Sequence, residues 1–132
     1  MGFLPVKSEH GAAPLWEYLP AKAAQFHAGQ VVEVMGGLLA PVTAAVTKVP
    51  TYICMYEGMT VYEGQTVPVI RVSDDCIYET TLAADAGAAV VGGKLQVSAD
   101  GLQAESGDGA FEIVELDGVA AGDTVRGRFV LG

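Results

Sequence analysis

The sequence predicts an all-β fold, a small β-barrel or sandwich with little helix. After residue 28, seven short runs are rich in β-branched and aromatic residues, and turn signals such as Gly36-Gly37 and Asp117-Gly118 separate them. Residues 83–89 form too short and too glycine-interrupted a stretch for a sizeable helix. The expected strands are 30–34, 51–56, 66–72, 77–82, 94–97, 110–116 and 124–131.

The first 27 residues are expected to form an extended arm. Pro5, Pro14 and Pro20 recur along this stretch, and proline cannot donate to a strand ladder or continue a helix. The large apolar side chains between the prolines need cover, either from the chain's own domain or from a neighbouring subunit. The sequence therefore divides into an extended N-terminal arm at 1–27 and a single β domain at 28–132.

The apolar side chains of the arm are the candidate partner-binding residues. Aromatic side chains are common anchors of protein interfaces. Trp16 and Tyr18 would point to the same side of an extended arm, because side chains alternate with period 2. The candidate interface residues are Phe3, Leu4, Leu15, Trp16, Tyr18 and Leu19.

Two stretches of the β domain suggest an internal repeat. Residues 28–72 align with 86–130 at a constant offset of 58, which superposes Gly64 on Gly122, each two residues before a Thr-Val pair. A genuine repeat predicts two similar β units in one barrel or sandwich, joined by a linker at 73–85. Chance similarity is the alternative, because glycine and valine are common in such sequences.

Length and charge exclude several classes of protein. The chain has 132 residues, enough for one domain, and a net charge of −9, which would repel a nucleic-acid backbone. No run reaches the roughly 18 apolar residues of a membrane-spanning helix. Only 17% of the residues are charged and 51% are hydrophobic, so we expect a homo-oligomer, first a trimer and then a dimer or another closed ring.

The residues that carry most enzyme chemistry are scarce and scattered. His10 and His27 are far from each other and from the cysteines in sequence, and Cys54 and Cys76 lack metal-binding spacing. Asp-Gly pairs are typical of turns. We therefore expect no catalytic residue, no metal and no cofactor. Both cysteines fit reduced packing residues, which together with the lack of a signal-peptide pattern predicts a cytoplasmic location when the protein is made.

A family resemblance follows from the layout of the chain. After the arm, Ala28-Gly29-Gln30-Val31-Val32 opens the β domain, and Gly122-Asp123-Thr124-Val125-Arg126 precedes the last strand. This layout resembles small phage and prophage structural proteins of Gram-positive bacteria, similar to the head-decoration proteins of tailed bacteriophages. The resemblance implies a compact β fold, frequent trimers, an N-terminal arm that binds the major capsid protein, and a place on the virion surface.

The leading prediction is a non-enzymatic virion structural protein that decorates or stabilises a capsid through oligomeric binding to its surface. The alternative is a small β-barrel binding module for a carbohydrate or another small ligand. Tyr52 and Tyr56 share one face of an expected strand and could form a recognition stripe, but core or subunit packing is the favoured role for them. A pocket lined by convergent polar groups would favour the binding module.

Overall fold

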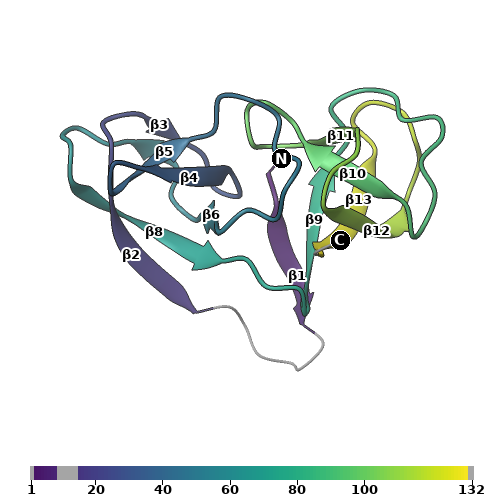
Figure 1. Cartoon of the computed structure of the whole chain (residues 1–132), viewed down its shortest axis with the longest axis horizontal. Coiled ribbons are helices and arrows are strands. Elements are labelled where there is room, and N and C mark those ends of the chain that lie inside the picture. The colour runs from purple at the N-terminus through teal and green to yellow at the C-terminus, as the bar shows by residue number, and fades with distance from the viewer. Residues whose placement is uncertain (1, 9–14, 131–132) are drawn as a thin grey trace.

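The all-β prediction is confirmed. The computed structural model describes residues 2–8 and 15–130, which form thirteen strands and no helix (Figure 1). The strands are β1 (Leu4–Ser8), β2 (Trp16–Ala21), β3 (Gln25–Phe26), β4 (Val31–Met35), β5 (Leu38–Pro41), β6 (Tyr52–Cys54), β7 (Gly58–Met59), β8 (Gln65–Arg71), β9 (Cys76–Thr81), β10 (Lys94–Val97), β11 (Ala104–Ser106), β12 (Phe111–Leu116) and β13 (Thr124–Phe129).

The strands form two main units that lie side by side in Figure 1. In the first, β2, β5, β4, β6 and β8 close into a barrel. In the second, six strands form a sheet in the order β1-β9-β13-β12-β10-β11. The short strands β3 and β7 make a separate pair.

The two units share one pattern of strand pairing. In the barrel, β2 pairs with β8, β8 with β6, β6 with β4 and β4 with β5, all antiparallel. In the second unit, β9, β13, β12, β10 and β11 pair in the same sequence, also antiparallel. A parallel contact then returns to the first strand in both units: Ala21 pairs with Leu39, and Leu82 pairs with Ala104.

The same hydrogen bonds recur at matching turns. The backbone N–H of Gly64 donates to the carbonyl of Ala21 at 2.8 Å, and that of Gly122 donates to the carbonyl of Leu82 at 2.8 Å. Both glycines have positive φ, 94° and 87°. Gly64 and Gly122 therefore hold equivalent places, as the offset of 58 suggested.

The first part of that alignment differs from the pairing. The N–H of Gly29 donates to the carbonyl of Cys54 at 2.7 Å, and that of Gly92 donates to the carbonyl of Ile113 at 2.8 Å. Gly29 and Gly92 have φ of 85° and 88°, whereas Gly87 is not in this region. The structural counterpart of Gly29 is thus Gly92 rather than Gly87. The repeated pairing spans 16–71 and 76–129, so it includes β2 and β9, which ranges 28–72 and 86–130 leave out.

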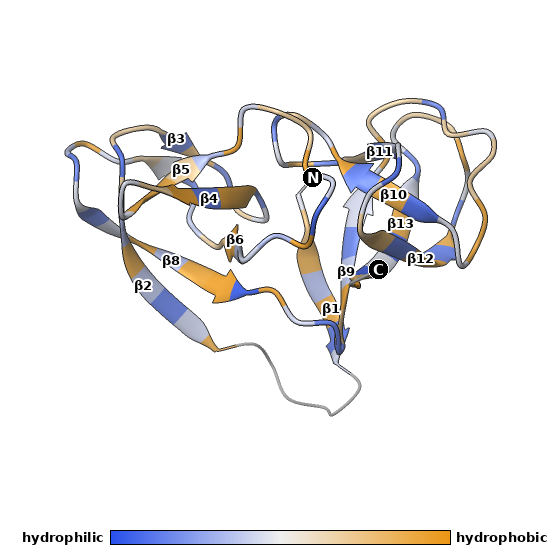
Figure 2. Cartoon of the chain, in the orientation of Figure 1, coloured by the Kyte–Doolittle hydropathy of each residue, from blue (hydrophilic) through white to orange (hydrophobic). Residues whose placement is uncertain are grey.

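Three barrel strands each contain two adjacent residues that are buried on opposite faces of the strand. Figure 2 shows β4 and β8 as largely hydrophobic, in contrast to the mixed colours of β2. Successive side chains of a strand point to opposite faces. One set therefore fills the barrel and the other packs against the second unit. The adjacent residues that divide in this way are Val32 and Val31, Cys54 and Ile53, and Val69 and Ile70.

The described residues of the N-terminal segment, 2–8 and 15–27, are part of both units rather than a separate arm. β2 pairs with β8 along all six of its residues, and β1 pairs with β9. Phe3 is fully buried, and its N–H donates to the carbonyl of Gly29 at 2.7 Å. In this respect the structure differs from the sequence expectation. Pro20 is compatible with β2 because its nitrogen faces away from β8, as the next subsection shows.

Candidate functional site

The structure separates the six candidate interface residues into buried and exposed groups. Phe3 lies in the larger core, and Leu19 packs against the barrel core. Leu4 is 42% exposed on β1, the outer strand of the six-stranded sheet. On and beside β2, Leu15 is 86% exposed, Trp16 54% and Tyr18 65%. His10, the other residue of interest in this segment, lies outside the described residues.

The exposed side chains of β2 form one stripe. Trp16, Tyr18 and Pro20 are exposed, whereas Glu17 and Leu19 between them are half-buried. The expectation that Trp16 and Tyr18 share a side therefore agrees with the alternating burial of this strand. We call Trp16, Tyr18 and Pro20 the β2 stripe. Sequence reasoning left Pro20 out, although its period-2 spacing from Tyr18 was a signal that could have included it.

The backbone of the β2 stripe faces an open sheet edge. Tyr18 is opposite Pro68 of β8, and the carbonyl of Pro68 accepts a hydrogen bond from Met55 on its other side, at 2.9 Å. In an antiparallel ladder, the N–H and C=O of one residue point to the same side. The Tyr18–Pro68 pair is therefore not hydrogen-bonded, and the polar groups of Tyr18 point away from β8. The hydrogen bond from the Gly64 N–H to the Ala21 carbonyl agrees with this alternation, because it shows that the backbone of an odd-numbered residue faces the β8 side.

The outer edge of β2 is unpaired over most of its length within the described part of the chain. β5 meets β2 only at Ala21, where the neighbouring Lys22 N–H donates to the Leu39 carbonyl at 2.9 Å. From Trp16 to Leu19, no described residue pairs with this edge. The N–H and carbonyl groups of Trp16 and of Tyr18 point outward. Such an edge is a template for an added strand.

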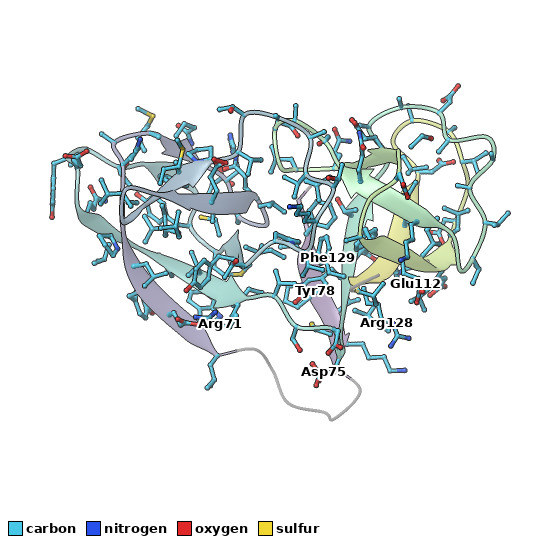
Figure 3. All side chains as sticks on the ribbon, viewed as in Figure 1. Arg71, Asp75, Tyr78, Glu112, Arg128 and Phe129 are labelled. Carbon is cyan, nitrogen blue, oxygen red and sulfur yellow. The ribbon has the colours of Figure 1, made fainter. Side chains whose placement is uncertain are left out.

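The charge beside this edge is balanced. The Glu17 carboxylate lies 3.3 Å from Nε of Arg71 on the neighbouring strand. Arg71 also donates to the Tyr52 hydroxyl at 2.9 Å, and its guanidinium carbon lies 4.9 Å from the centroid of the Tyr52 ring. Figure 3 shows Arg71 on the β2–β8 side of the molecule. Tyr52 is thus used in packing and in holding Arg71.

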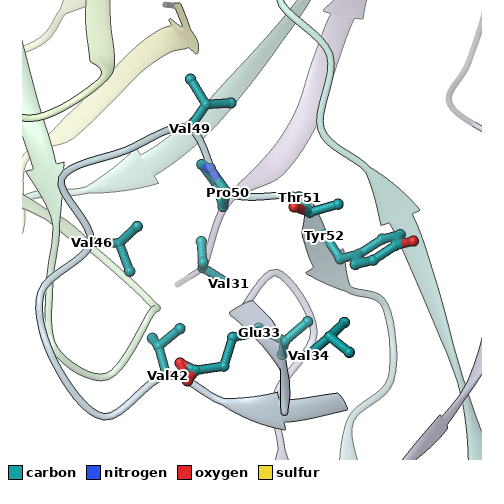
Figure 4. Close-up of a pocket in the computed structure, with 10 residues that line it drawn as sticks. Val31, Glu33, Val34, Val42, Val46, Val49, Pro50, Thr51 and Tyr52 are labelled. Carbon is teal, nitrogen blue, oxygen red and sulfur yellow. The ribbon is translucent and has the colours of Figure 1, made fainter. Parts of the chain in front are cut away.

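A second candidate site is a groove beside β4 (Figure 4). Its volume is about 350 Å³, and Glu33 supplies a carboxylate to a mostly valine-lined wall. The loop between β5 and β6 forms the opposite wall. The lining residues are Val31, Val32, Glu33, Val34, Val42, Val46, Val49, Pro50, Thr51 and Tyr52. Glu33 is the one charged side chain in this lining, and Thr51 and Tyr52 are the other residues with polar side chains.

In the described part of the chain, the His27 ring contacts the Glu57 carboxylate. Its Nδ1 lies 2.8 Å from Oε2 of Glu57, and Oε1 of Glu57 accepts the N–H of Ala28 at 3.1 Å. The Ala28 N–H and the His27 hydrogen bond hold the pKa of Glu57 below its ordinary value of 4.5. This cluster ties the loop before β4 to the loop after β6.

The two cysteines are buried and free. Burial raises the pKa of the Cys54 thiol to about 11 and also raises the pKa of Cys76. Thiols of this kind are poor nucleophiles, because the thiolate is the reactive form. Over residues 2–8 and 15–130, no group of three or more His, Cys, Asp or Glu side chains is placed to hold a metal ion.

Several acidic residues of the second unit form an ion-pair cluster. Arg126 on β13 lies 2.8 Å from Glu79 on β9, 3.3 Å from Glu115 on β12 and 3.4 Å from Asp117. Burial lowers the pKa of Arg126, but the three carboxylates outweigh this effect and raise it. The cluster links three neighbouring strands.

No protein-family model matches the chain, and a search of curated proteins finds no match. Among the described residues, no helix has the length and apolar character needed to cross a membrane. The fold and the β2 stripe therefore carry the functional argument.

Proposed function

We propose that the protein is a non-enzymatic structural subunit that acts as a homo-oligomer on the surface of a larger assembly, as a phage head-decoration protein does. The observation that carries this proposal is the β2 stripe, where exposed aromatic rings lie along an unpaired strand edge. Aromatic side chains anchor protein interfaces, and open edges recruit strands. The family resemblance of the sequence supports the choice of a capsid surface as the larger assembly.

The proposal is tested by measuring the protein content of purified phage particles. Phage particles induced from a bacterium that encodes this chain would be isolated on a density gradient and quantified by mass spectrometry. We expect the chain at a fixed ratio to the major capsid protein, and particles that lack it should lose their contents at a lower temperature. Absence of the chain from the particle fraction would contradict the proposal.

The groove beside β4 supports a second candidate function, the binding of a small ligand. Its volume of about 350 Å³ lies at the low end for small-molecule sites, and Glu33 would select a ligand with a cationic or hydroxyl group. A screen of sugars and small amines by ligand-observed NMR tests this function, with Glu33→Gln as the matched variant. Binding that Glu33→Gln does not weaken would contradict a role for this groove.

A further inference from the structure

We propose that the open edge of β2 pairs with β2 of a second copy of this chain, antiparallel and about a two-fold axis. The inference rests on the proposed function in one respect, that the protein works as a homo-oligomer, and it names the contact. The resulting unit is a dimer, the alternative to the trimer that the sequence favoured.

The second unit of the chain shows how such an edge is covered. β9 holds the place of β2 in the repeated pairing, and β1 lies antiparallel along its outer edge, from Leu4 opposite Glu79 to Ser8 opposite Cys76. Leu82 of the second unit is equivalent to Ala21 of the barrel, so residues 76–79 of β9 are equivalent to residues 15–18. The same edge is thus covered by an antiparallel strand in one unit and left open in the other, over the described part of the chain.

The polar groups of β2 are complementary to themselves. With Trp16 opposite Tyr18 of the second copy, each N–H of these two residues faces a carbonyl, which gives about four hydrogen bonds between the copies. Pro20 lies beyond this register, so its missing N–H removes no bond. A strand edge whose only donors are at 16 and 18 suits its own copy better than a long foreign strand.

The side chains favour the same partner. In this register the Trp16 ring of one copy lies opposite the Tyr18 ring of the other, and cross-strand aromatic pairs stabilise antiparallel sheets. The chain carries a net charge of −9, so two copies repel each other over most of their surface. Next to β2, the Glu17 carboxylate is paired with Arg71, and the stripe itself is uncharged. Charge repulsion therefore opposes self-association least at this edge.

A charge-exchange experiment tests the contact. One variant carries Trp16→Lys and Tyr18→Lys, and the other carries Trp16→Glu and Tyr18→Glu. Both side chains are exposed and neither backbone position bonds to β8, so both variants should fold like the wild type. By sedimentation velocity, we expect the wild type to be a dimer, each variant alone a monomer, and their equimolar mixture a heterodimer.

Tyr62→Glu is the matched control, because Tyr62 is an exposed aromatic in the turn before β8, at the Ala21 end of β2 and so at the opposite end of the strand from Trp16. It should leave the dimer intact. Amide hydrogen exchange gives a second measurement that needs no variant. Trp16 and Tyr18 should become more protected as protein concentration rises, whereas Glu17 and Leu19, which bond to β8, should stay protected throughout.

Three results would overturn the inference. The first is a wild type that stays monomeric across the concentration range, and the second is an oligomer that persists in both charged variants. The third is an amide exchange rate at residues 16 and 18 that does not change with protein concentration. The proposed function fails separately. An oligomer on phage particles that survives both charged variants would contradict only the β2 contact, and a β2 dimer absent from particles would contradict only the decoration role.

Discussion

The ring of Phe3 packs edge-on against the ring of Phe111, with centroids 5.3 Å apart and planes at 79°. Phe3 also lies 5.5 Å from Phe129, which in turn contacts Tyr78 at 5.6 Å. Figure 3 shows Tyr78 and Phe129 in the middle of the molecule, between the two units. A residue near the start of the chain thus completes the aromatic core of its second half.

Removal of the Phe3 ring should be costly. We expect Phe3→Ala to lower the free energy of unfolding by about 3–5 kcal/mol, because it leaves a cavity among well-packed rings. Urea denaturation followed by circular dichroism measures this change. Leu4→Ala is the control, since Leu4 is adjacent but 42% exposed, and it should cost far less. Equal costs for the two variants would show that Phe3 is not packed as described.

The equivalent turns at Gly64 and Gly122 should respond alike to substitution. Both have positive φ, and nothing lies within 4 Å of an added Cβ, so the cost of alanine comes from the backbone alone. We expect Gly64→Ala and Gly122→Ala each to destabilise by about 1–2 kcal/mol. Gly87→Ala is the matched control, with open space around the Cβ and no positive φ, and should be nearly neutral. A large cost at one turn and none at the other would contradict their equivalence.

The Glu57 cluster predicts a dependence of stability on pH. Because the folded pKa of Glu57 lies below 4.5, its ionised form stabilises the fold above that pH, and this contribution is lost as the pH falls through the folded pKa. We expect Glu57→Gln to unfold at a lower temperature than the wild type at pH 7, with the difference shrinking below pH 4.5. Glu63→Gln removes the same charge from an exposed turn and should show no such trend. A difference between wild type and Glu57→Gln that is constant with pH would argue against the contact with Ala28 and His27.

The buried thiols should be unreactive in the native protein. With the pKa of Cys54 raised to about 11 and that of Cys76 also raised, little thiolate forms at pH 8. An aromatic disulfide reagent should modify neither residue until the chain unfolds, when both should react. Ser106→Cys, placed at an exposed strand position, provides a thiol that should react at once. Native Cys54 or Cys76 reacting as fast as this added thiol would contradict their burial.

Much of the strand content could be predicted from the sequence, because runs of β-branched residues between glycine turns favour strands over helices. The expected strand 94–97 coincides with β10, the expected strand 66–72 differs from β8 by one residue at each end, and 110–116 differs from β12 by one residue at its start. The strands that were missed are β1, β2, β3, β5, β7 and β11. Proline occurs in β1, β2 and β5, whereas β3 and β7 have only two residues each, and β11 reads Ala-Glu-Ser. These strands form because long-range partners hold them, which local propensity does not reveal.

The candidate site was only partly accessible to the same reasoning. Period-2 alternation placed Trp16 and Tyr18 on one side, and it would have placed Leu19 on the other, where it packs against the barrel core. The openness of the β2 edge depends on which strands pair and in which register. That information arises from the whole fold, so the sequence alone could not show that Tyr18 presents its backbone as well as its ring.

The pairing of β1 with β9 also affects the order in which parts of the chain can fold during synthesis. Residues 16–71 contain every strand of the barrel, so all five strands are available for pairing once Arg71 has left the ribosome. β1 is made before its partner strand β9 and before Phe111 and Phe129, whose rings surround Phe3. The Phe3 side chain therefore stays exposed until these rings are made. Contacts between such distant segments slow folding, and apolar side chains that are exposed in the meantime are open to capture by a chaperone.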